Sequence, residues 1–429
     1  MQIPIPFSDT LIPVSVPDDR IAFIEDLPKT DPLPAWEEEL DRLLDHPTAG
    51  EPLSAFLRPS GSVLLLVEDQ TRHTPVSRIL PVLLAYLNRN GVPDSLISIL
   101  IAPGTHRILT DEEIQKKIGP ETAKRIRVLQ HDYRDPECLA DLGTVEAAGI
   151  EIPVRVNRAV LEADTVIGLG NIIPHPNAGF SGGAKILDPG CCGRETVSGT
   201  HMAAALLGFI PLGVMENDCR SSMEEVASRA GLNFIVNVVL NSSNEVIRLV
   251  TGDPVLAHRA GCMASREAFG IPIPKPADIL ISCSYPYDSD FWQCEKAMTT
   301  GNLAVRKDGI LILAAPCLEG LAHNHDDLLL WTQMSCREVT EAIRKADPSD
   351  PDLDIVAAGI AMGANLVREK VRHVFLYAPP LSADTVEKLG YVSFPSLQEA
   401  IDEALRLIPD GSVGVLLRGG DCLPIPQAD

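Results

Sequence analysis

Two short polar segments of the chain combine side chains that can hold an anion and move a proton. The first, DQTR, brings a carboxylate, an amide, a hydroxyl and a guanidinium together as Asp69, Gln70, Thr71 and Arg72. A guanidinium can bind a carboxylate or phosphate through two parallel hydrogen bonds. The second, GTHR, contains His106, whose imidazole can serve as base, acid or metal ligand. Both segments are candidate parts of an anion-binding, proton-transferring site.

A glycine-rich segment at residues 170–190, GNIIPHPNAGFSGGAKILDPG, adds His175 and Lys185. Glycines let the backbone approach a ligand closely and present its N–H groups. The segment differs from the phosphate loop of nucleotide hydrolases, because Ala184 precedes the lysine and Ile186 replaces the hydroxyl residue that would hold magnesium. Lys185 is therefore a candidate nucleophile or covalent anchor, and a phosphate-facing cation is the alternative.

The same region argues against a dehydrogenase that binds NAD. The dinucleotide fingerprint G-x-G-x-x-G needs a third glycine, whereas residues 168–173 read GLGNII. A hydride-transferring enzyme of the standard dinucleotide-binding type is thus disfavoured.

Further polar positions are weaker candidates when each is taken alone. His201 lies in GTHM, and Gln293 and Lys296 lie three residues apart in FWQCEK, on one face of a predicted helix. His323 and His325 in LAHNHDD are a candidate metal pair, but the aspartates beside them favour a solvated loop. We therefore keep His201, Gln293 and Lys296 as site candidates and leave the LAHNHDD pair out.

The composition limits the partners and the compartment. The 429 residues carry 36 Lys and Arg against 59 Asp and Glu, a net charge of −23, and form no basic stripe for nucleic acid or anionic lipid. The ten cysteines include no C-x-x-C pair, so we expect no zinc framework. No apolar run is long enough to cross a membrane, and the first residues lack a signal-peptide pattern. We expect a cytoplasmic protein with reduced thiols.

The elements that must position these residues alternate between strand and helix. Four short apolar runs predict strands, at residues 62–67, 95–102, 125–130 and 163–170. Helical patterns separate them, and we predict helix starts at Thr110, with Glu113 completing a capping box, and at Thr74, with Pro75 as the first helical residue. Alternation of this kind predicts a parallel sheet, in which ligands bind beyond the carboxyl ends of the strands.

A second series of strands and helices follows a segment with three prolines, IPIPKPAD at residues 271–278, which we interpret as a linker. The sequence therefore predicts an α/β protein of two domains with parallel sheets, residues 1–270 and 271–407. A last strand-like run at residues 412–418 fits either domain, so the segment from about 408 to 429 is a candidate to pack back on the first domain.

Taken in order, these motifs resemble the nickel-dependent lactate racemase family. The resemblance rests on DQTR, GTHR, PH-x-x-AGFSGG-x-K from Pro174 to Lys185, His201 and the Q-x-x-K pair, and it extends over most of the chain. It implies a racemase or epimerase of 2-hydroxy acids, with the active site in the cleft between two α/β domains. It also implies nickel held in a pincer nucleotide, pyridinium-3,5-bisthiocarboxylic acid mononucleotide, which other proteins synthesise and load.

The resemblance carries roles to individual positions. Lys185 corresponds to the lysine that bonds the cofactor covalently, and His201 to the protein ligand of nickel. His106 and His175 correspond to the paired acid and base. The remaining positions correspond to a cofactor-contacting loop and a substrate-contacting set; the loop comprises Asp69, Gln70, Thr71 and Arg72, and the set comprises Arg72, Gln293 and Lys296.

The substrate and one other class of function stay open. Where lactate-specific members carry aromatic residues, this chain has Pro176 and Asn177 after the catalytic PH, and Trp292 before Gln293, which suggests room for a larger or more polar 2-hydroxy acid. The alternatives are a non-catalytic protein that binds or carries the nickel cofactor and, more remotely, an NAD-dependent 2-hydroxy acid dehydrogenase. The pairing of two histidines favours the enzyme, because a carrier needs no acid and base. The sequence does not predict an oligomeric state.

Overall fold

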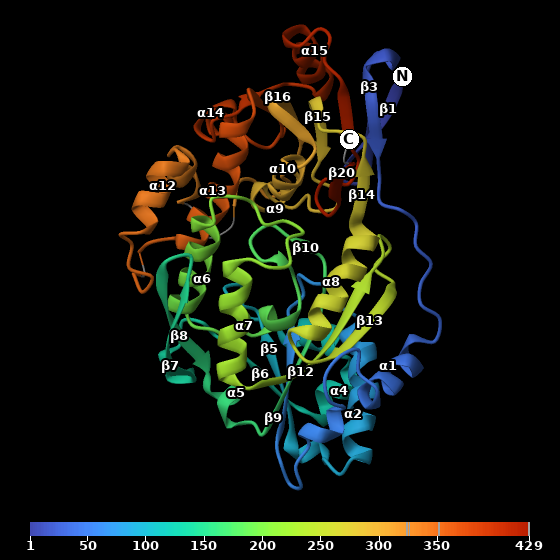
Figure 1. Cartoon of the computed structure of the whole chain (residues 1–429), viewed down its shortest axis with the longest axis vertical. Helices are drawn as coiled ribbons and strands as arrows, with labels where there is room; N and C mark the ends of the chain where they lie inside the picture. The colour runs from blue at the N-terminus through green and yellow to red at the C-terminus, as the bar shows by residue number, and fades with distance from the viewer. Residues whose placement is uncertain (323–324, 326, 351, 428–429) are drawn as a thin grey trace.

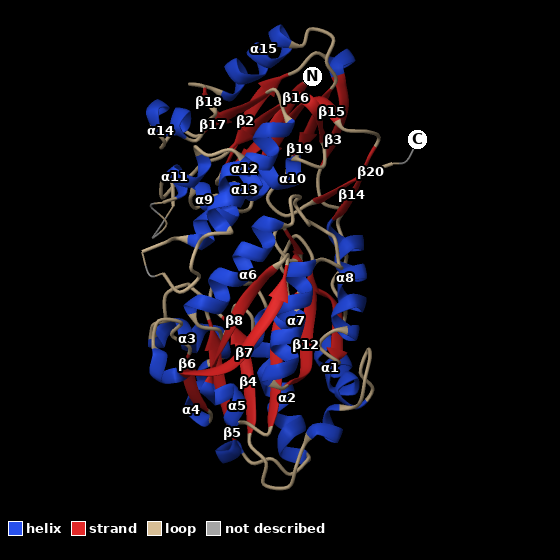
Figure 2. Ribbon diagram, turned by 60° about the vertical axis from the view of Figure 1, so that its left-hand side comes forward, coloured by secondary structure: helices blue, strands red, loops and turns tan. Residues whose placement is uncertain are grey.

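Two six-stranded sheets lie one beyond the other along the long axis of the molecule (Figure 1). The computed structural model describes residues 1–322, 325, 327–350 and 352–427. Helices cover both faces of the two sheets (Figure 2). The chain is thus an α/β protein with two parallel-stranded layers, as the sequence predicts.

The first sheet has the strand order β13-β12-β9-β4-β5-β6 and is parallel except for the β12–β13 pair. Its strands, in chain order, are β4 (Val63–Glu68), β5 (Ile97–Ala102), β6 (Arg127–Gln130), β9 (Thr165–Asn171), β12 (Leu232–Leu240) and β13 (Val246–Gly252). The four predicted strands of this region are confirmed. Strands β4, β5 and β9 are mostly apolar because both of their faces are buried, whereas the edge strand β6 is only partly buried.

Two layers cover the first sheet. One face packs against α1 (Trp36–Asp45), α2 (Val76–Arg89), α3 (Asp111–Ile118) and α4 (Pro120–Arg125). The other face packs against α6 (Arg194–Leu206), α7 (Asp218–Ala230) and a hairpin of β7 (Leu139–Ala147) and β8 (Ile150–Asn157), which α5 (Arg158–Glu162) follows. Helix α8 (Leu256–Phe269) packs on β12 and β13.

The second sheet is parallel throughout, in the order β18-β17-β16-β15-β19-β3. Its strands are β3 (Ile21–Glu25), β15 (Ala277–Cys283), β16 (Val305–Ala314), β17 (His373–Tyr377), β18 (Val392–Ser393) and β19 (Val413–Leu416). A hairpin of β1 (Gln2–Phe7) and β2 (Thr10–Ser15) and helix α15 (Leu397–Leu407) pack on one face.

The remaining helices belong to the second layer. The other face of its sheet packs against α9 (Phe291–Cys294), α10 (Lys296–Gly301), α11 (Leu328–Thr332), α12 (Cys336–Ile343), α13 (Ile355–Lys370) and α14 (Ala383–Lys388). Among the residues described, no helix is both long and apolar enough to span a membrane.

The domain limits drawn from sequence differ from the structure at both chain ends. Strand β3 pairs with β19, and β19 pairs with β15, so residues near both termini complete the second sheet instead of joining the first. The physical reason is that β19 is fully buried and requires a hydrogen-bonding neighbour on each side. Figure 1 shows this directly: the blue N-terminal strands lie beside the orange and red segments.

Two local predictions are also corrected. The proline-rich segment is not a free linker, because β14 (Gly270–Ile273) pairs in parallel with β20 (Leu423–Pro426). Thr74 does not cap α2; its hydroxyl donates to Glu68, and the helix begins at Val76. The capping box of Thr110 and Glu113 at the start of α3 is confirmed.

Candidate active site

A cavity of about 1060 Å³ is lined by residues of both sheet layers. Its walls contain every site residue predicted from the sequence, from residues 69–72 through His106, His175, Lys185 and His201 to the Gln293 and Lys296 pair. Topology explains the convergence. In the first sheet the chain runs from β4 outward to β5 and then returns to β9 on the other side of β4, so the loops after β4 and β9 diverge and leave a crevice.

Asp69 and His106 form a short polar contact in this cavity. Asp69 Oδ2 lies 2.6 Å from His106 Nδ1, and Asp69 Oδ1 accepts hydrogen bonds from the backbone and the hydroxyl of Thr71. Burial would raise the pKa of Asp69, but the bonds from His106 and Thr71 outweigh it and lower the pKa to about 2. An ionised Asp69 fixes the proton on Nδ1 of His106, so Nε2 is left to accept a proton.

Partly buried hydrogen bonds to charged side chains hold the DQTR loop in place. Lys117 donates to the backbone oxygen of Arg72 at 2.8 Å, and Thr74 donates to Glu68. Glu68 also accepts from the backbone N–H of Asn171 at 3.4 Å, which ties the loop after β4 to the end of β9. Arg72 is thereby presented to the cavity by a loop that is fixed at several points.

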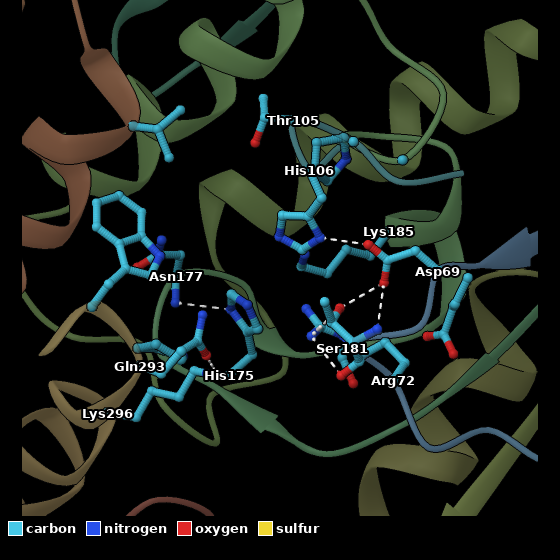
Figure 3. Close-up of a pocket in the computed structure, with 18 of the residues that line it drawn as sticks. Asp69, Arg72, Thr105, His106, His175, Asn177, Ser181, Lys185, Gln293 and Lys296 are labelled. Atoms are coloured by element: carbon cyan, nitrogen blue, oxygen red, sulfur yellow. Dashed lines mark hydrogen bonds and ion pairs between the residues drawn. The ribbon is translucent and has the colours of Figure 1, made fainter. Parts of the chain in front are cut away.

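His175 has the opposite hydrogen-bond pattern to His106. Its Nδ1 accepts from the backbone N–H groups of Asn177 and Ala178, at 3.2 and 3.3 Å. The neutral ring therefore carries its proton on Nε2, which is free to donate. Burial first, and then the positive charges of Lys185 and Arg72, hold the pKa of His175 well below its usual value. In Figure 3 His175 lies with Asn177, Gln293 and Lys296, apart from the His106 and Asp69 pair.

The glycine-rich loop that carries His175 and Lys185 is folded tightly around a buried arginine. Arg220, on α7, is fully buried and donates to the backbone oxygens of Ala178, Phe180 and Gly182. Gly179 has a φ of +76°, and a Cβ there would lie 1.9 Å from the oxygen of Val214. The sequence GFSGG is therefore required by this packing as well as by any ligand.

Lys185 and His201 both face the cavity with an unused nitrogen. His201 Nδ1 is bonded to the backbone oxygen of Val197 at 2.7 Å, which leaves Nε2 available as a metal ligand. Burial lowers the pKa of His201 to about 4, so the imidazole is neutral. Lys185 Nζ makes no hydrogen bond with the described residues, and burial together with the charge of Arg72 lowers its pKa to about 8. A neutral amine is accessible there near neutral pH.

The second sheet contributes the Gln293 and Lys296 pair. Asp290 caps α9 by accepting from the backbone of Gln293, and Lys296 Nζ donates to Gln293 Oε1 at 2.6 Å. Lys296 also lies over the ring of Tyr287, 3.8 Å from its centroid. Burial and the charge of Arg72 lower the pKa of Lys296 to about 7. An anion bound between Arg72 and Lys296 would relieve their repulsion.

Two residues outside the predicted site set also line the cavity. His325, for which the sequence favours a solvated loop, stacks on Trp292 with a centroid distance of 3.8 Å, and its Nδ1 lies 2.8 Å from Asp354 Oδ2. Glu295 lies next to Lys296 and is only 2% exposed. In the sequence, only its position between Gln293 and Lys296 indicates that Glu295 belongs to the site. His323 lies outside the described residues.

Several cavity atoms lack partners in the part of the chain that is described. Gln70 Oε1 and Asn171 Oδ1 are buried without a hydrogen bond, and both residues line the cavity near the DQTR and glycine-rich loops. Buried polar atoms are normally paired, so these atoms indicate a polar ligand in this part of the cavity. Among the described residues no cluster of three or more His, Cys, Asp or Glu side chains forms a metal site.

Comparison with known proteins gives one consistent result. Residues 7–207 match the family model described as the lactate racemase N-terminal domain, and residues 273–419 match the lactate racemase C-terminal domain. The chain is 28% identical to the lactate racemase of Thermoanaerobacterium thermosaccharolyticum, over 97% of this chain and 99% of that protein. It is also 28% identical to the lactate racemase of Lactiplantibacillus plantarum, over 89% of this chain and 91% of that protein.

Solved structures agree with these matches. The lactate racemase apoprotein of Thermoanaerobacterium thermosaccharolyticum superposes with a TM-score of 0.86 at 26% identity, covering 99% of this chain and all of that one. A protein from Thermotoga maritima superposes with a TM-score of 0.70 at 22% identity, covering 93% of this chain and all of that one, and shows the same fold.

Proposed function

The chain belongs to the lactate racemase family, and we propose that it is an isomerase that inverts C2 of a 2-hydroxy acid, lactate or a larger and more polar one. One observation carries the proposal: a carboxylate-paired histidine, a histidine with the opposite hydrogen-bond pattern, a free lysine amine and a free imidazole line one cavity. These are the groups needed to move a proton at a hydroxyl and to hold a cofactor beside it.

The cavity residues fit the nickel pincer nucleotide that the family uses. His201 Nε2 would supply an imidazole donor to nickel, and Lys185 Nζ would supply the covalent attachment. The unpaired Gln70 Oε1 and Asn171 Oδ1 would accept hydrogen bonds from the nucleotide. When bound, the cofactor supplies a hydride acceptor for the hydrogen on C2.

The chain's own residues would bind and orient the substrate. Arg72 and Lys296 carry the positive charge for its carboxylate, and Gln293 fixes the Lys296 amine at 2.6 Å. Burial and the charge of Arg72 lower the pKa of Lys296 to about 7, and a bound carboxylate would raise it. This binding holds C2 in place while its hydroxyl remains free to meet a histidine.

Proton transfer then falls to the two histidines. His106 Nε2 would accept the hydroxyl proton, and the ionised Asp69 would stabilise the imidazolium. His175 Nε2–H would donate to the oxygen when the planar 2-keto acid presents its other face. Two differently hydrogen-bonded histidines suit inversion, because the acid and the base act on the oxygen from different positions.

The test uses protein made together with the cofactor-synthesis proteins, so that the cofactor is loaded. Enantiopure lactate and other 2-hydroxy acids deuterated at C2 are incubated in ordinary water and separated by chiral chromatography. We expect inversion with retention of deuterium, because hydride transfer does not exchange C2–H with solvent. Inversion with loss of the label would contradict hydride transfer, and no inversion of any acid would favour the carrier protein.

The variant Lys185→Ala tests whether Lys185 is the residue to which the cofactor is covalently attached. Intact-mass measurement should find the cofactor's added mass on the loaded wild-type chain and none on Lys185→Ala. Lys370→Ala is the matched control, because Lys370 is half-buried, donates to Asn302 and lines no part of the cavity. An adduct that persists in Lys185→Ala would reject the assignment of the anchor.

Cytoplasmic location of this protein and loading of its cofactor by partner proteins remain predictions.

A further inference from the structure

The end of the cavity near the second sheet forms a pocket that the proposed steps at C2 do not use. We define it as the distal pocket, lined by Asn177, Trp292, Glu295, His325, Asp354 and Ile360. We propose that this pocket binds a hydroxylated chain attached to C2, so that the protein is a C2 epimerase of polyhydroxylated 2-hydroxy acids with His325 as its specificity-determining residue. The inference rests on the proposed function and names its substrate class.

His325 is held rigidly and still has one free nitrogen. Trp292 covers one face of its ring at a centroid distance of 3.8 Å and an interplanar angle of 8°. Asp354 Oδ2 lies 2.8 Å from Nδ1, and Asp354 Oδ1 accepts from the backbone of Ala357 at the start of α13. The carboxylate therefore retains the proton on Nδ1, so the neutral ring offers Nε2 as an acceptor. The structure records no other bond to this ring among the described residues.

Glu295 supplies the second unsatisfied group. The residue is 2% exposed, and its Oε1 has no hydrogen-bond partner among the residues that the structure describes, although Glu295 lines the cavity. It lies one helical turn after Trp292. It also lines a second, small cavity together with Asn177 and Ile360, which places all three at the same end. Burial raises the pKa of Glu295 to about 8, so the group is mainly protonated at neutral pH and can both donate and accept.

The chemistry of these atoms selects among possible substrate chains. A methyl group, as in lactate, would offer no hydrogen bond to His325 Nε2 and would leave Glu295 Oε1 buried without a partner among the described residues. A second carboxylate has no proton to donate to Nε2 and would be repelled by the carboxylate of Asp354, which pairs with the same ring. A hydroxyl both donates and accepts, so it satisfies the imidazole nitrogen, the Asn177 amide and the Glu295 carboxyl alike.

The first experiment compares substrates on the cofactor-loaded wild-type protein. Lactate, malate and gluconate, each as one stereoisomer at C2, are assayed for inversion at C2 by chromatography. We expect kcat/KM for gluconate to exceed that for lactate and for malate by at least tenfold. If lactate or malate is inverted as well as gluconate or better, the inference is overturned while the proposed function stands. If no acid is inverted, the proposed function itself fails.

The second experiment assigns the preference to His325. His325→Phe preserves the stacked ring on Trp292 but removes both nitrogens, so the ratio of kcat/KM for gluconate to that for lactate should fall at least tenfold, mainly through KM. His373→Phe is the matched control, since His373 stacks on Phe375 away from the cavity, and its ratio should not change. An unchanged ratio in His325→Phe would overturn the assignment.

A second variant guards against misfolding of the first. Asp354→Asn keeps an oxygen for the Nδ1 proton but removes the charge that fixes it, so the same ratio should fall in the same direction by a smaller factor. Thermal melting checks that both variants fold. If Asp354→Asn also leaves the ratio unchanged, the His325 and Asp354 pair does not select the substrate.

Discussion

His106 and His175 both use ring nitrogen Nδ1 in a hydrogen bond within the protein, but in opposite roles. Asp69 occupies Nδ1 of His106 and leaves an acceptor, whereas two backbone N–H groups occupy Nδ1 of His175 and leave a donor. The difference arises from short-range geometry: His175 precedes a tight turn whose N–H groups point back at its ring, and His106 reaches across to the neighbouring loop. At the residue scale, acid and base are thus assigned by hydrogen bonds rather than by residue type.

Replacement of His106 should remove the group that accepts the hydroxyl proton of the substrate. We expect His106→Asn to lower kcat for inversion by about 10²–10⁴-fold, the usual contribution of a positioned base, with a smaller effect on KM. The measurement is steady-state inversion by the loaded variant. His373→Phe serves again as the control that should retain activity. Near-normal kcat in His106→Asn would remove this residue from proton transfer.

Lys296 predicts a pH dependence of substrate binding. Burial and the charge of Arg72 lower its pKa to about 7, so the protein without substrate loses this positive charge as pH rises through 7. KM for the substrate should therefore rise above about pH 7. In Lys296→Arg the guanidinium stays charged, so the rise should be flattened even if KM is higher throughout. Identical pH profiles for the two proteins would show that Lys296 does not carry the charge that binds the carboxylate.

At the scale of elements, the loop after β9 depends on a helix that comes later in the chain. Arg220 of α7 donates to three backbone oxygens of that loop, at Ala178, Phe180 and Gly182. An irregular loop of glycines has few internal hydrogen bonds, so its buried oxygens need such an external donor. The loop's shape, and with it the positions of His175 and Lys185, is therefore set by α7.

The variant Arg220→Met tests whether the loop after β9 depends on Arg220 of α7. It removes the guanidinium donor from three buried carbonyl oxygens, of which those of Ala178 and Gly182 each keep one backbone donor, so we expect a loss of about 2–3 kcal/mol in the free energy of unfolding. Urea unfolding followed by circular dichroism measures it. Arg229→Met on the same helix is the matched control, because Arg229 is exposed and pairs with Glu225, and it should change stability by no more than about 0.5 kcal/mol. Equal losses in both variants would contradict the role of Arg220.

At the scale of the whole molecule, the two ends of the chain close the second sheet. Strand β3 lies at the edge beside β19, and Phe23 of β3 packs over Gly414, where a Cβ would lie 2.2 Å from the phenyl ring. The second layer is thus discontinuous in sequence, with the whole first sheet inserted between β3 and β15. Loops of both layers line one cavity.

Deletion of residues 1–27 should therefore damage the second layer rather than the first. Without β3, the buried strand β19 becomes an exposed apolar edge, and we expect aggregation in size-exclusion chromatography together with a lower melting temperature. Attachment of residues 1–27 through a flexible linker after residue 427 should restore a monodisperse protein, since both chain ends lie on the same layer (Figure 1). A stable, monodisperse deletion variant would contradict this reading.

Much of the fold and the site could be predicted from the residues alone. Continuous apolar runs such as residues 62–67 mark strands buried on both faces, and helical spacing between them requires parallel pairing. The site segments follow strand ends, so their convergence in one cavity follows from the same rule. The prediction was weakest at the proline-rich segment and at residues 412–418, whose partners lie far away in the sequence.

Most local elements, the family and the set of groups that can do chemistry could be predicted from the sequence, because apolar period, glycine placement and motif order are local properties. Three features required the folded structure: the pairing of β3 with β19, the support of the glycine-rich loop by Arg220, and the stacking of His325 on Trp292. These are contacts between distant segments. The energy of these contacts depends on burial and on which partner satisfies each polar atom. Neither can be predicted from the spacing of residues along the chain.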